Sequence, residues 1–508
     1  MALFFLAFMT ACSEKDAGTS TESGSASEER KILTIAQGAD IQTFDAQNHN
    51  DGVTGSVLVN FGHSLFEKRD GDMKIEPALA KEYEIIDDVT WEIKLRDDVI
   101  WHNGDKFTAE DVKFTIERVI KDEALKEHHV FKVIKEVQVI DEFTFRLITE
   151  QPYPTMLALL SKNGSQMQPK KYIEEQGWDY YLSNPINNGP YKFKEWQKDN
   201  VVILERFDDY FGGTPYWDEI RFRAIPENST RVSELLAGNV DIITNVPTNE
   251  WDRIDDNEGT NLHLGDGTRV YNLIMKYDEG PTSNQKIREA IELAIDKELI
   301  INQVLRGAGT PTRTRIAPGV FGFAEDLYGV GLYDPEKAKE LVKEAGYPDG
   351  VELELLVPKG RYLMDAEMGT ILADMLGKVG INVKLNVLEF SAYINKFYAG
   401  DYGGLTLIAY GDDFLDASYG MNEYRTENAT PRFNYSSEKY DQLYLEALSN
   451  MDSESREKQL IEMQHMIFRD EHVQRPFIHL KVPYGLNDRI EFNSRITEDF
   501  HAEKIRLK

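Results

Sequence analysis

The sequence predicts an α/β protein in which mixed sheets are flanked by helices. The main observation is an alternation of patterns between residues 334 and 409. A helix is expected to open at Asp334-Pro335 with a cap and an N1 proline, and to end at Gly346. The order that follows is a strand at 351–357, a helix at 365–379, a strand at 381–387, a helix at 391–398 and a strand at 405–409. This β-α-β-α-β order is typical of an open α/β lobe.

Length and composition support a large globular protein. The 508 residues suffice for two or three domains, and 41% of them are hydrophobic. The net charge is −31, from 88 acidic and 57 basic residues. Because a nucleic-acid partner requires clustered Lys and Arg, we expect no nucleic-acid binding.

The remaining elements follow from local patterns. Residues 77–83 suggest a short helical turn, and 90–95 alternates as a half-buried strand. Thr108 and Asp111 have capping-box spacing before a helix with one apolar stripe. Further predictions are strands at 32–36, 201–206 and 220–225, a hairpin at 137–147, a helix opened by Ser229, a long helix at 286–301, two helices in 438–470, and apolar helices at 57–66 and 152–160.

The N-terminus resembles a lipoprotein signal. A short apolar run, Ala2 to Met9, precedes Thr10-Ala11-Cys12, so cleavage before Cys12 and lipidation of its sulfur are expected. Residues 13–30 hold no large apolar side chain and predict a flexible linker between the lipid and the folded part. The alternative is an ordinary apolar N-terminus with a stray cysteine. Since Cys12 is the only cysteine, no intrachain disulfide or cysteine-ligated zinc site is expected.

Catalytic motifs are absent from the sequence. It contains no G-x-S-x-G elbow, no Walker A loop and no H-E-x-x-H helix. His128-His129 and the histidines at 465, 472 and 479 are expected to be ordinary surface or core residues rather than metal ligands. We therefore expect no enzyme activity, no cofactor and no metal.

The stretch Pro77–Arg118 carries a family resemblance. Its order L-A, W-x-I-x-L-R-x-x-V-x-W-H-x-G-x-x-F-T-A-x-D-V-x-F-T resembles the signature of the family-5 extracellular solute-binding proteins, the peptide- and nickel-type receptors of ABC importers. The resemblance implies a two-lobed, periplasmic-binding-protein-like clamshell with an extra domain. It places domain I at 31–66, 185–270 and 481–508, domain II at 67–184 and domain III at 271–480, with crossings near Val270 and Leu480.

The segment Ala409–Ala417 is the leading candidate for ligand binding. It follows a predicted buried strand at the carboxyl end of an α/β lobe, where ligands tend to bind. It resembles the family's G-W-x-x-D-Y-x-(D/E)-P motif, which implies that Asp413 binds a ligand ammonium group and that Tyr410 packs on the ligand. The other candidates in this segment are Gly411, Asp412 and Phe414, while Asp416 is expected in a turn or capping role. The alternative for Asp413 is a turn carboxylate that caps a helix.

The opposite wall is expected to come from Asp51, Gly52 and Val53, which resemble the family's peptide-pairing strand; a loop with exposed backbone is the alternative. Leu407 stands where some oligopeptide receptors place an arginine. Four other basic residues are candidates to bind a ligand carboxylate, each with a solvated surface charge as the alternative: Lys359, Arg361, Arg313 and Arg315.

The resemblance thus implies a monomeric receptor, lipid-anchored outside the cell membrane (on its periplasmic face if the organism has an outer membrane). It would capture di- to oligopeptides and deliver them to ABC permease subunits with separate ATPases. The alternatives are the same fold binding a nickel chelate, glutathione or an opine, and a peptide sensor without transport.

Overall fold

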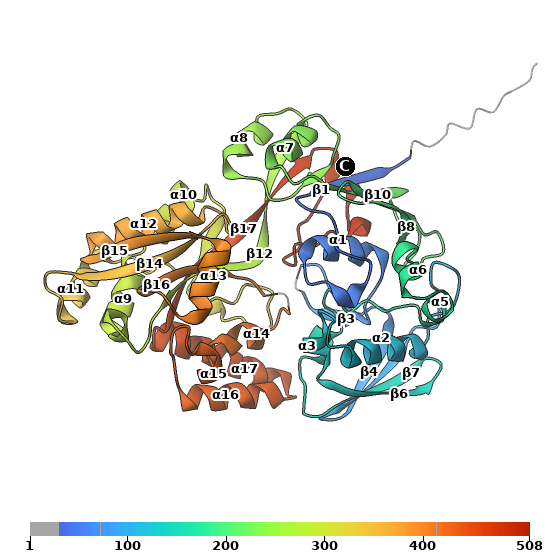
Figure 1. Cartoon of the computed structure of the whole chain (residues 1–508), viewed down its shortest axis with the longest axis horizontal. Helices are drawn as coiled ribbons and strands as arrows, with labels where there is room; N and C mark the ends of the chain where they lie inside the picture. Colours follow the sequence, from blue (N-terminus) through green and yellow to red (C-terminus); the bar gives the residue numbers. More distant parts are fainter. Residues whose placement is uncertain (1–29, 72, 413) are drawn as a thin grey trace, which may run out of the picture.

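The computed structural model describes residues 30–71, 73–412 and 414–508. Two predicted functional residues lie outside these ranges: the lipidation site Cys12 and the ligand-binding candidate Asp413. Within them, two halves flank a pair of long strands (Figure 1). No helix in the described ranges is long and apolar enough to cross a membrane.

One mixed sheet of eleven strands runs through both halves, in the order β15-β14-β16-β12-β17-β11-β1-β10-β9-β8, with β13 paired to β17. Its strands are β1 (Ile32–Gln37), β8 (Tyr191–Gln197), β9 (Val201–Arg206), β10 (Glu219–Ala224), β11 (Ile242–Ile243), β12 (Thr260–Met275), β13 (Gly309–Pro311), β14 (Val351–Lys359), β15 (Ile381–Glu389), β16 (Gly404–Tyr410) and β17 (Gln474–Asn487). We call the part around β1 and β8–β11 lobe 1, and the part around β13–β16 lobe 2.

Strands β12 and β17 connect the two lobes. They pair antiparallel from Thr260 opposite Asn487 to Ile274 opposite Gln474. The register shifts between Asp266 and Val270, so the ladder is interrupted where the strands pass from one lobe to the other. Such an irregularity bends a strand and can redirect its side chains.

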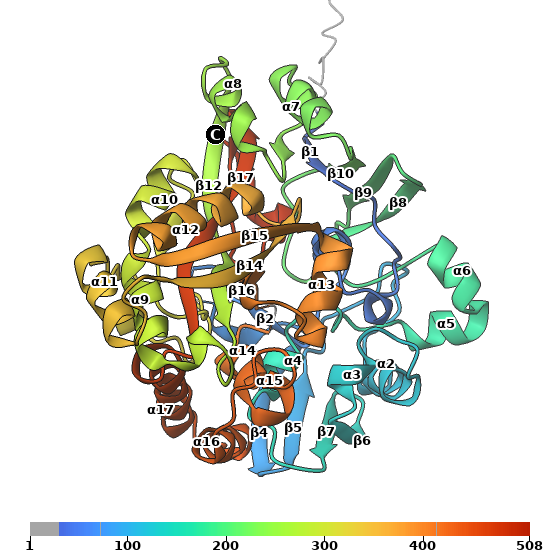
Figure 2. The ribbon, with the colours of Figure 1, turned by 60° about the vertical axis from the view of Figure 1, so that its left-hand side comes forward.

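Lobe 2 has the predicted β-α-β-α-β order. Strand β14 pairs in parallel with both β15 and β16. The connecting helices α12 (Asp365–Lys378) and α13 (Phe390–Ala399) pack against β14 and β15 (Figure 2). Asp334 caps α11 (Pro335–Glu344) by accepting from Lys337 N, as predicted.

The prediction of one long helix at 286–301 is wrong. The segment forms α9 (Gln285–Ala294) and α10 (Lys297–Gln303). Ile295 leaves the helical conformation, and the Asp296 carboxylate accepts from Leu299 N at 2.9 Å, which starts a new helix. An aspartate cap inside an amphipathic pattern therefore outweighs the continuous apolar spacing.

A separate four-stranded antiparallel sheet, β4-β5-β7-β6, forms what we call the small-sheet domain. Its elements are β4 (Ala80–Asp87), β5 (Thr90–Leu95), β6 (Ile134–Asp141), β7 (Thr144–Thr149) and the covering helix α2 (Ala109–Lys121). The predicted strand at 90–95 is confirmed, with Trp91, Ile93 and Leu95 buried. The Asp111 carboxylate accepts from Thr108 N at 2.9 Å, which confirms the capping box.

The helical turn predicted at 77–83 is wrong. Pro77 ends β3 (Ile75–Pro77), which pairs with β2 (Phe66–Lys68), and Ala80 begins β4. Tyr83 lies opposite Ile93 of β5, so pairing with a distant strand decides the conformation. Context of this kind commonly outweighs local helix propensity.

Three further boundaries differ from the sequence predictions. The helix expected at 152–160 is confined to α4 (Met156–Leu159). The helix expected at 57–66 is α1 (Gly52–Phe61), because Asp51 caps it and accepts from Thr54 N at 2.8 Å. Glu227, rather than Ser229, precedes α7. The remaining helices are α3 (His128–Phe131), α4 (Met156–Leu159), α5 (Lys170–Gln176), α6 (Trp178–Ser183), α7 (Asn228–Leu236), α8 (Trp251–Asp255), α14 (Ala417–Met421), α15 (Thr426–Ala429), α16 (Glu438–Ser449) and α17 (Ser453–Gln464).

Apolar side chains interlock lobe 2 with the rest of the molecule. Phe414, from the loop after β16, belongs to the core of the small-sheet domain. In return, Met73 and Ile496 pack into a lobe 2 cluster that contains Ile316 and Val320. These contacts hold the loop after β16 against the opposite side of the molecule.

Candidate functional site

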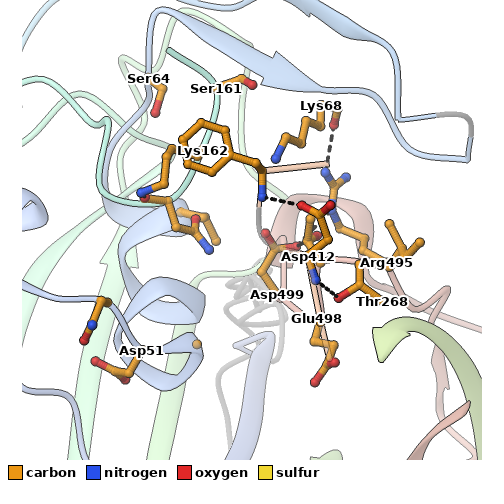
Figure 3. A pocket seen from close by; sticks show the side chains of 18 of the residues that line it. Asp51, Ser64, Lys68, Ser161, Lys162, Thr268, Asp412, Arg495, Glu498 and Asp499 are labelled. Atoms are coloured by element: carbon orange, nitrogen blue, oxygen red, sulfur yellow. Dashed lines mark hydrogen bonds and ion pairs between the residues drawn. The ribbon is translucent and has the colours of Figure 1, made fainter. Parts of the chain in front are cut away.

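A cavity of about 620 Å³ lies where α1, β2, α3 and the loop after β16 meet (Figure 3). Its walls come from residues 49–68, from α3 and from the segment 161–166 on one side, and from β12 and the loop after β16 on the other. The C-terminal segment 495–501 closes part of the wall. The volume falls within the range of roughly 300 to 1,000 Å³ that is usual for small-ligand pockets.

Asp412, in the described part of the loop after β16, lines this cavity with its carboxyl group. Its backbone N–H donates to Thr268 Oγ1 at 3.0 Å, and its Oδ1 accepts from Phe414 N at 3.0 Å and Leu415 N at 2.9 Å. Its Oδ2 is buried and has no hydrogen-bond partner among the described residues. Burial, together with the nearby Asp416, raises the pKa of the Asp412 carboxyl to about 7. The described contacts therefore leave one oxygen of this carboxyl without a hydrogen bond, and burial disfavours its charged form.

Asp416 has the capping role that the sequence predicts. Its carboxylate accepts from Ser418 N at 3.0 Å at the start of α14. It also accepts two hydrogen bonds from the buried Arg456 guanidinium, both at 2.7 Å. This carboxylate is fully engaged and is therefore a structural group.

The other candidates of the 409–417 segment separate into two groups. Gly411 and Phe414 line the cavity with Asp412. Tyr410 is not among the lining residues; its ring lies under the Arg315 guanidinium, 3.9 Å from the carbon to the ring centre, and packs against the lobe 2 core. Asp413 lies outside the described residues, so its role stays a prediction.

On the opposite wall, Asp51 and Gly52 line the cavity, whereas Val53 does not. The expectation of a peptide-pairing strand here is wrong. Asp51 caps α1 and its carbonyl accepts from Gly55 N at 3.1 Å, so the segment enters a helix at Gly52. The Asp51 Oδ2 atom is buried and has no hydrogen-bond partner in the described ranges.

His49 is a cavity residue that the sequence did not single out. It is buried, and neither ring nitrogen has a hydrogen-bond partner within the described part of the chain. Burial lowers the pKa of this imidazole, with the Asp51 carboxylate, 3.9 Å from Nδ1, opposing the shift. A single histidine in a loop matches no binding or catalytic motif, so the sequence alone could not have identified His49.

One of the four basic candidates reaches the cavity. Arg361 lines it, exposed and without an ion pair among the described residues. Lys359 lies on the surface, Arg313 forms a buried ion pair with Glu292 at 2.5 Å, and Arg315 is buried on Tyr410. The electrostatic surroundings therefore leave Arg361 available to an anion.

Arg269 also lines the cavity and was missed by the sequence analysis. It lies on β12 beside the register shift and is half-buried. Its sequence context is that of an ordinary strand, so only its position next to the expected crossing at Val270 could have drawn attention to it.

Two other cations of the cavity form ion pairs with the protein's own carboxylates. Lys162 is paired with Glu127 at 2.5 Å. Arg495 is paired with Asp70 and, at 2.9 Å, with Asp499. Across the described ranges no group of three or more His, Cys, Asp or Glu residues is placed to hold a metal ion.

The comparison with family models decides the family. The model of the bacterial extracellular solute-binding proteins, family 5 (middle), matches residues 74–431. The chain belongs to this family. The resemblance drawn from Pro77–Arg118 is thereby confirmed.

Relatives and solved structures agree with the assignment of this family 5 protein. The glutathione-binding protein GsiB of Salmonella paratyphi A is 30% identical over 328 residues, which are 64% of this chain. The match spans 63% of that relative's own length. Both the relative and the family are described as binding proteins.

Two solved structures share the fold. HbpA2 from Haemophilus parasuis has a TM-score of 0.84 at 22% identity, covering 94% of this chain and 100% of the other. The periplasmic binding protein DppA from Helicobacter pylori, in complex with the peptide STSA, has a TM-score of 0.71 at 24% identity, covering 94% and 98%. The predicted two-lobed α/β fold is confirmed.

Proposed function

We propose that this family 5 protein is the receptor of an ABC importer and captures short peptides outside the cell membrane. The observation that supports this most is the charge arrangement of the cavity. Asp412, whose Oδ2 has no hydrogen-bond partner among the described residues, lines the same space of about 620 Å³ as Arg361, a guanidinium without an ion pair in those ranges. A peptide with free ends carries the complementary ammonium and carboxylate groups.

Peptide termini fit this site for a physical reason. A charged group enclosed in a cavity loses its hydration, and the loss is offset only by an opposite charge or by hydrogen bonds. We propose that Asp413, by the family motif, binds the ammonium group with Asp412 beside it. Arg361 would take the terminal carboxylate as a bidentate pair.

No covalent chemistry is part of this function. The ligand would contact both lobes at once and shift the population of lobe arrangements toward the bound one. We propose that the division into domains I, II and III, with crossings near Val270 and Leu480, is the mechanical basis of this change in lobe arrangement. The lipid anchor at Cys12, the permease and ATPase partners, the monomeric state and the extracytoplasmic location belong to the same proposal.

Glutathione is a second candidate ligand. The support is that relatives 30% identical to this chain are glutathione-binding proteins. Glutathione is a small peptide with one ammonium and two carboxylates, so it would use the same charged groups. A nickel chelate, an opine and a sensor without transport are not favoured by a specific observation.

Isothermal titration calorimetry tests the proposal with Ala-Ala-Ala, its N-acetylated form and reduced glutathione. We expect the free peptide to bind, and Asp413→Ala to weaken it by about tenfold or more, since a charge-assisted hydrogen bond contributes roughly 1.5–3 kcal/mol. The acetylated peptide should lose much less. Asp349→Ala, at an exposed turn, is the matched control.

Two outcomes would count against these assignments. Equal losses for the free and the acetylated peptide would contradict the ammonium role of Asp413. Failure of every member of a mixed peptide library to bind, with tight binding of a sugar or metal chelate instead, would refute the peptide function.

A further inference from the structure

We infer that Arg269 forms a second anion subsite, which makes this receptor select peptides that carry an additional carboxylate beside the terminal one. The inference rests on the proposed peptide function and concerns the class of ligand. It names a specificity-determining residue on the strand that joins the two lobes.

The first observation is the local shape of β12. Pairing with β17 is regular up to Asp266 opposite Lys481 and resumes at Val270 opposite His479. Three residues of β12 therefore face one of β17, Leu480, and Thr268 and Arg269 lie in this irregular stretch. The Thr268 hydroxyl accepts from Asp412 N at 3.0 Å, so the stretch is fastened to the loop after β16. This bulge places Arg269 at the cavity wall.

The second observation is the space beside Gly411. A methyl group at Gly411 would lie 3.2 Å from Thr268 Oγ1, 3.8 Å from Arg269 Cγ and 3.9 Å from Arg269 Nη1. The first distance is tight and the other two are ordinary van der Waals contacts, so the Arg269 side chain lies alongside Gly411. The guanidinium therefore lies next to the loop that carries the other ligand-binding candidates.

The third observation is charge. Among the described residues, Arg269 has no ion pair, although the chain has 88 acidic residues against 57 basic ones. Neighbouring cavity cations are paired: Lys162 with Glu127, and Arg495 with Asp499. A half-buried guanidinium without a counterion has lost part of its hydration with no opposite charge to offset that loss. A ligand carboxylate would supply the opposite charge.

Arg269 and Arg361 both line the cavity. Burial raises the pKa of Tyr362, and the guanidiniums of Arg361 and Arg269 both oppose that rise. The Arg361 carbon lies 5.5 Å from the centre of the Tyr362 ring. Two guanidiniums in one cavity match a residue with two carboxylates, such as a C-terminal aspartate or glutamate.

Titration of three peptides, Ala-Ala-Ala, Ala-Ala-Gln and Ala-Ala-Glu, tests the inference. The measured quantity is the ratio of the affinities for Ala-Ala-Glu and Ala-Ala-Gln, which differ in one charge and little in shape. We expect about tenfold or more in favour of Ala-Ala-Glu for the natural protein. Arg269→Gln should bring the ratio to about one, and Arg269→Lys, which keeps the charge but loses the planar fork, should leave an intermediate ratio.

Arg361→Gln is the matched comparison, because it should weaken all three peptides and leave the ratio unchanged. A ratio near one in the natural protein, or a ratio that survives Arg269→Gln, would overturn the inference while the peptide function stands. Failure of all three peptides to bind the natural protein would overturn the proposed function and the inference together. Urea unfolding of each variant verifies that the fold is intact.

Discussion

Replacing Asp412 by asparagine should stabilise this protein above neutral pH. Asp412 is 5% exposed, and its Oδ1 accepts two backbone N–H groups that an amide oxygen can also satisfy. Its Oδ2 has no hydrogen-bond partner among the described residues. The side chain thus has one useful oxygen and one that is costly to ionise, and asparagine keeps the first while removing the charge.

The magnitude follows from the pKa of this carboxyl, which burial and the neighbouring Asp416 raise from 3.8 to about 7. Each pKa unit corresponds to about 1.36 kcal/mol, so the full shift corresponds to about 4 kcal/mol. Because the folded state holds the proton more tightly than the unfolded chain, the favourable contribution is present below pH about 4. It is lost as the pH rises toward about 7. Between pH 5 and pH 8 the advantage of Asp412→Asn should grow by about 2.5 kcal/mol.

Urea unfolding of the natural protein and the variant at pH 5, 6, 7 and 8 measures this difference directly. The exposed Asp349→Asn is the control and should show no such growth. A difference between Asp412→Asn and the natural protein that stays constant from pH 5 to pH 8 would refute the reasoning, since it would mean that the carboxyl does not titrate in this range. Destabilisation at pH 8 would show that Oδ2 has a charged partner that the described contacts lack.

Two further substitutions test how the parts of the molecule are joined. Gly189→Ala places a methyl group 2.6 Å from the Phe61 carbonyl carbon, so it should lower the free energy of unfolding, measured in urea, by at least about 2 kcal/mol. Gly377→Ala, on the open side of α12, is the control and should raise the free energy of unfolding by about 0.5 kcal/mol. Equal effects of the two would contradict the close backbone approach. Arg118→Leu removes the partner of Asp45, whose two oxygens it contacts at 2.8 and 2.5 Å, and should cost about 3 kcal/mol. The double variant with Asp45→Asn should recover part of that loss, and no recovery would show that packing rather than charge is responsible.

The elements that could be predicted from the sequence are those whose signals are local. The alternation at 90–95, the Thr108–Asp111 capping box and the Asp334-Pro335 helix start each involve neighbouring residues, and each appears in the structure. The failures at 77–83 and 286–301 have a different origin. Strand β4 exists because β5 lies beside it, and the break between α9 and α10 depends on one aspartate cap within an otherwise continuous pattern.

The candidate site divides in the same way. Gly411, Asp412 and Phe414 could be predicted because they are contiguous and follow a buried strand. Arg269 and His49 could not, because the first depends on a register shift between two distant strands and the second on burial beside a helix start. Ion pairs decide which cations remain available to the cavity. The partner in such an ion pair can be distant in the sequence, as Glu292 is from Arg313.

The family signature at Pro77–Arg118 includes His102, which connects two parts of the molecule by hydrogen bonds. This imidazole accepts from Asn187 N at Nδ1, 3.1 Å away, and Nε2 lies 3.0 Å from the Gly189 carbonyl, to which it donates. Burial lowers its pKa to about 3, so the ring stays neutral and keeps both bonds across the physiological range. His102 thereby ties the small-sheet domain to the segment that returns to lobe 1. The cavity residues come from other segments, around Asp51, Arg269, Arg361 and Asp412, so substitutions in the cavity wall leave this joint of the family signature unaltered.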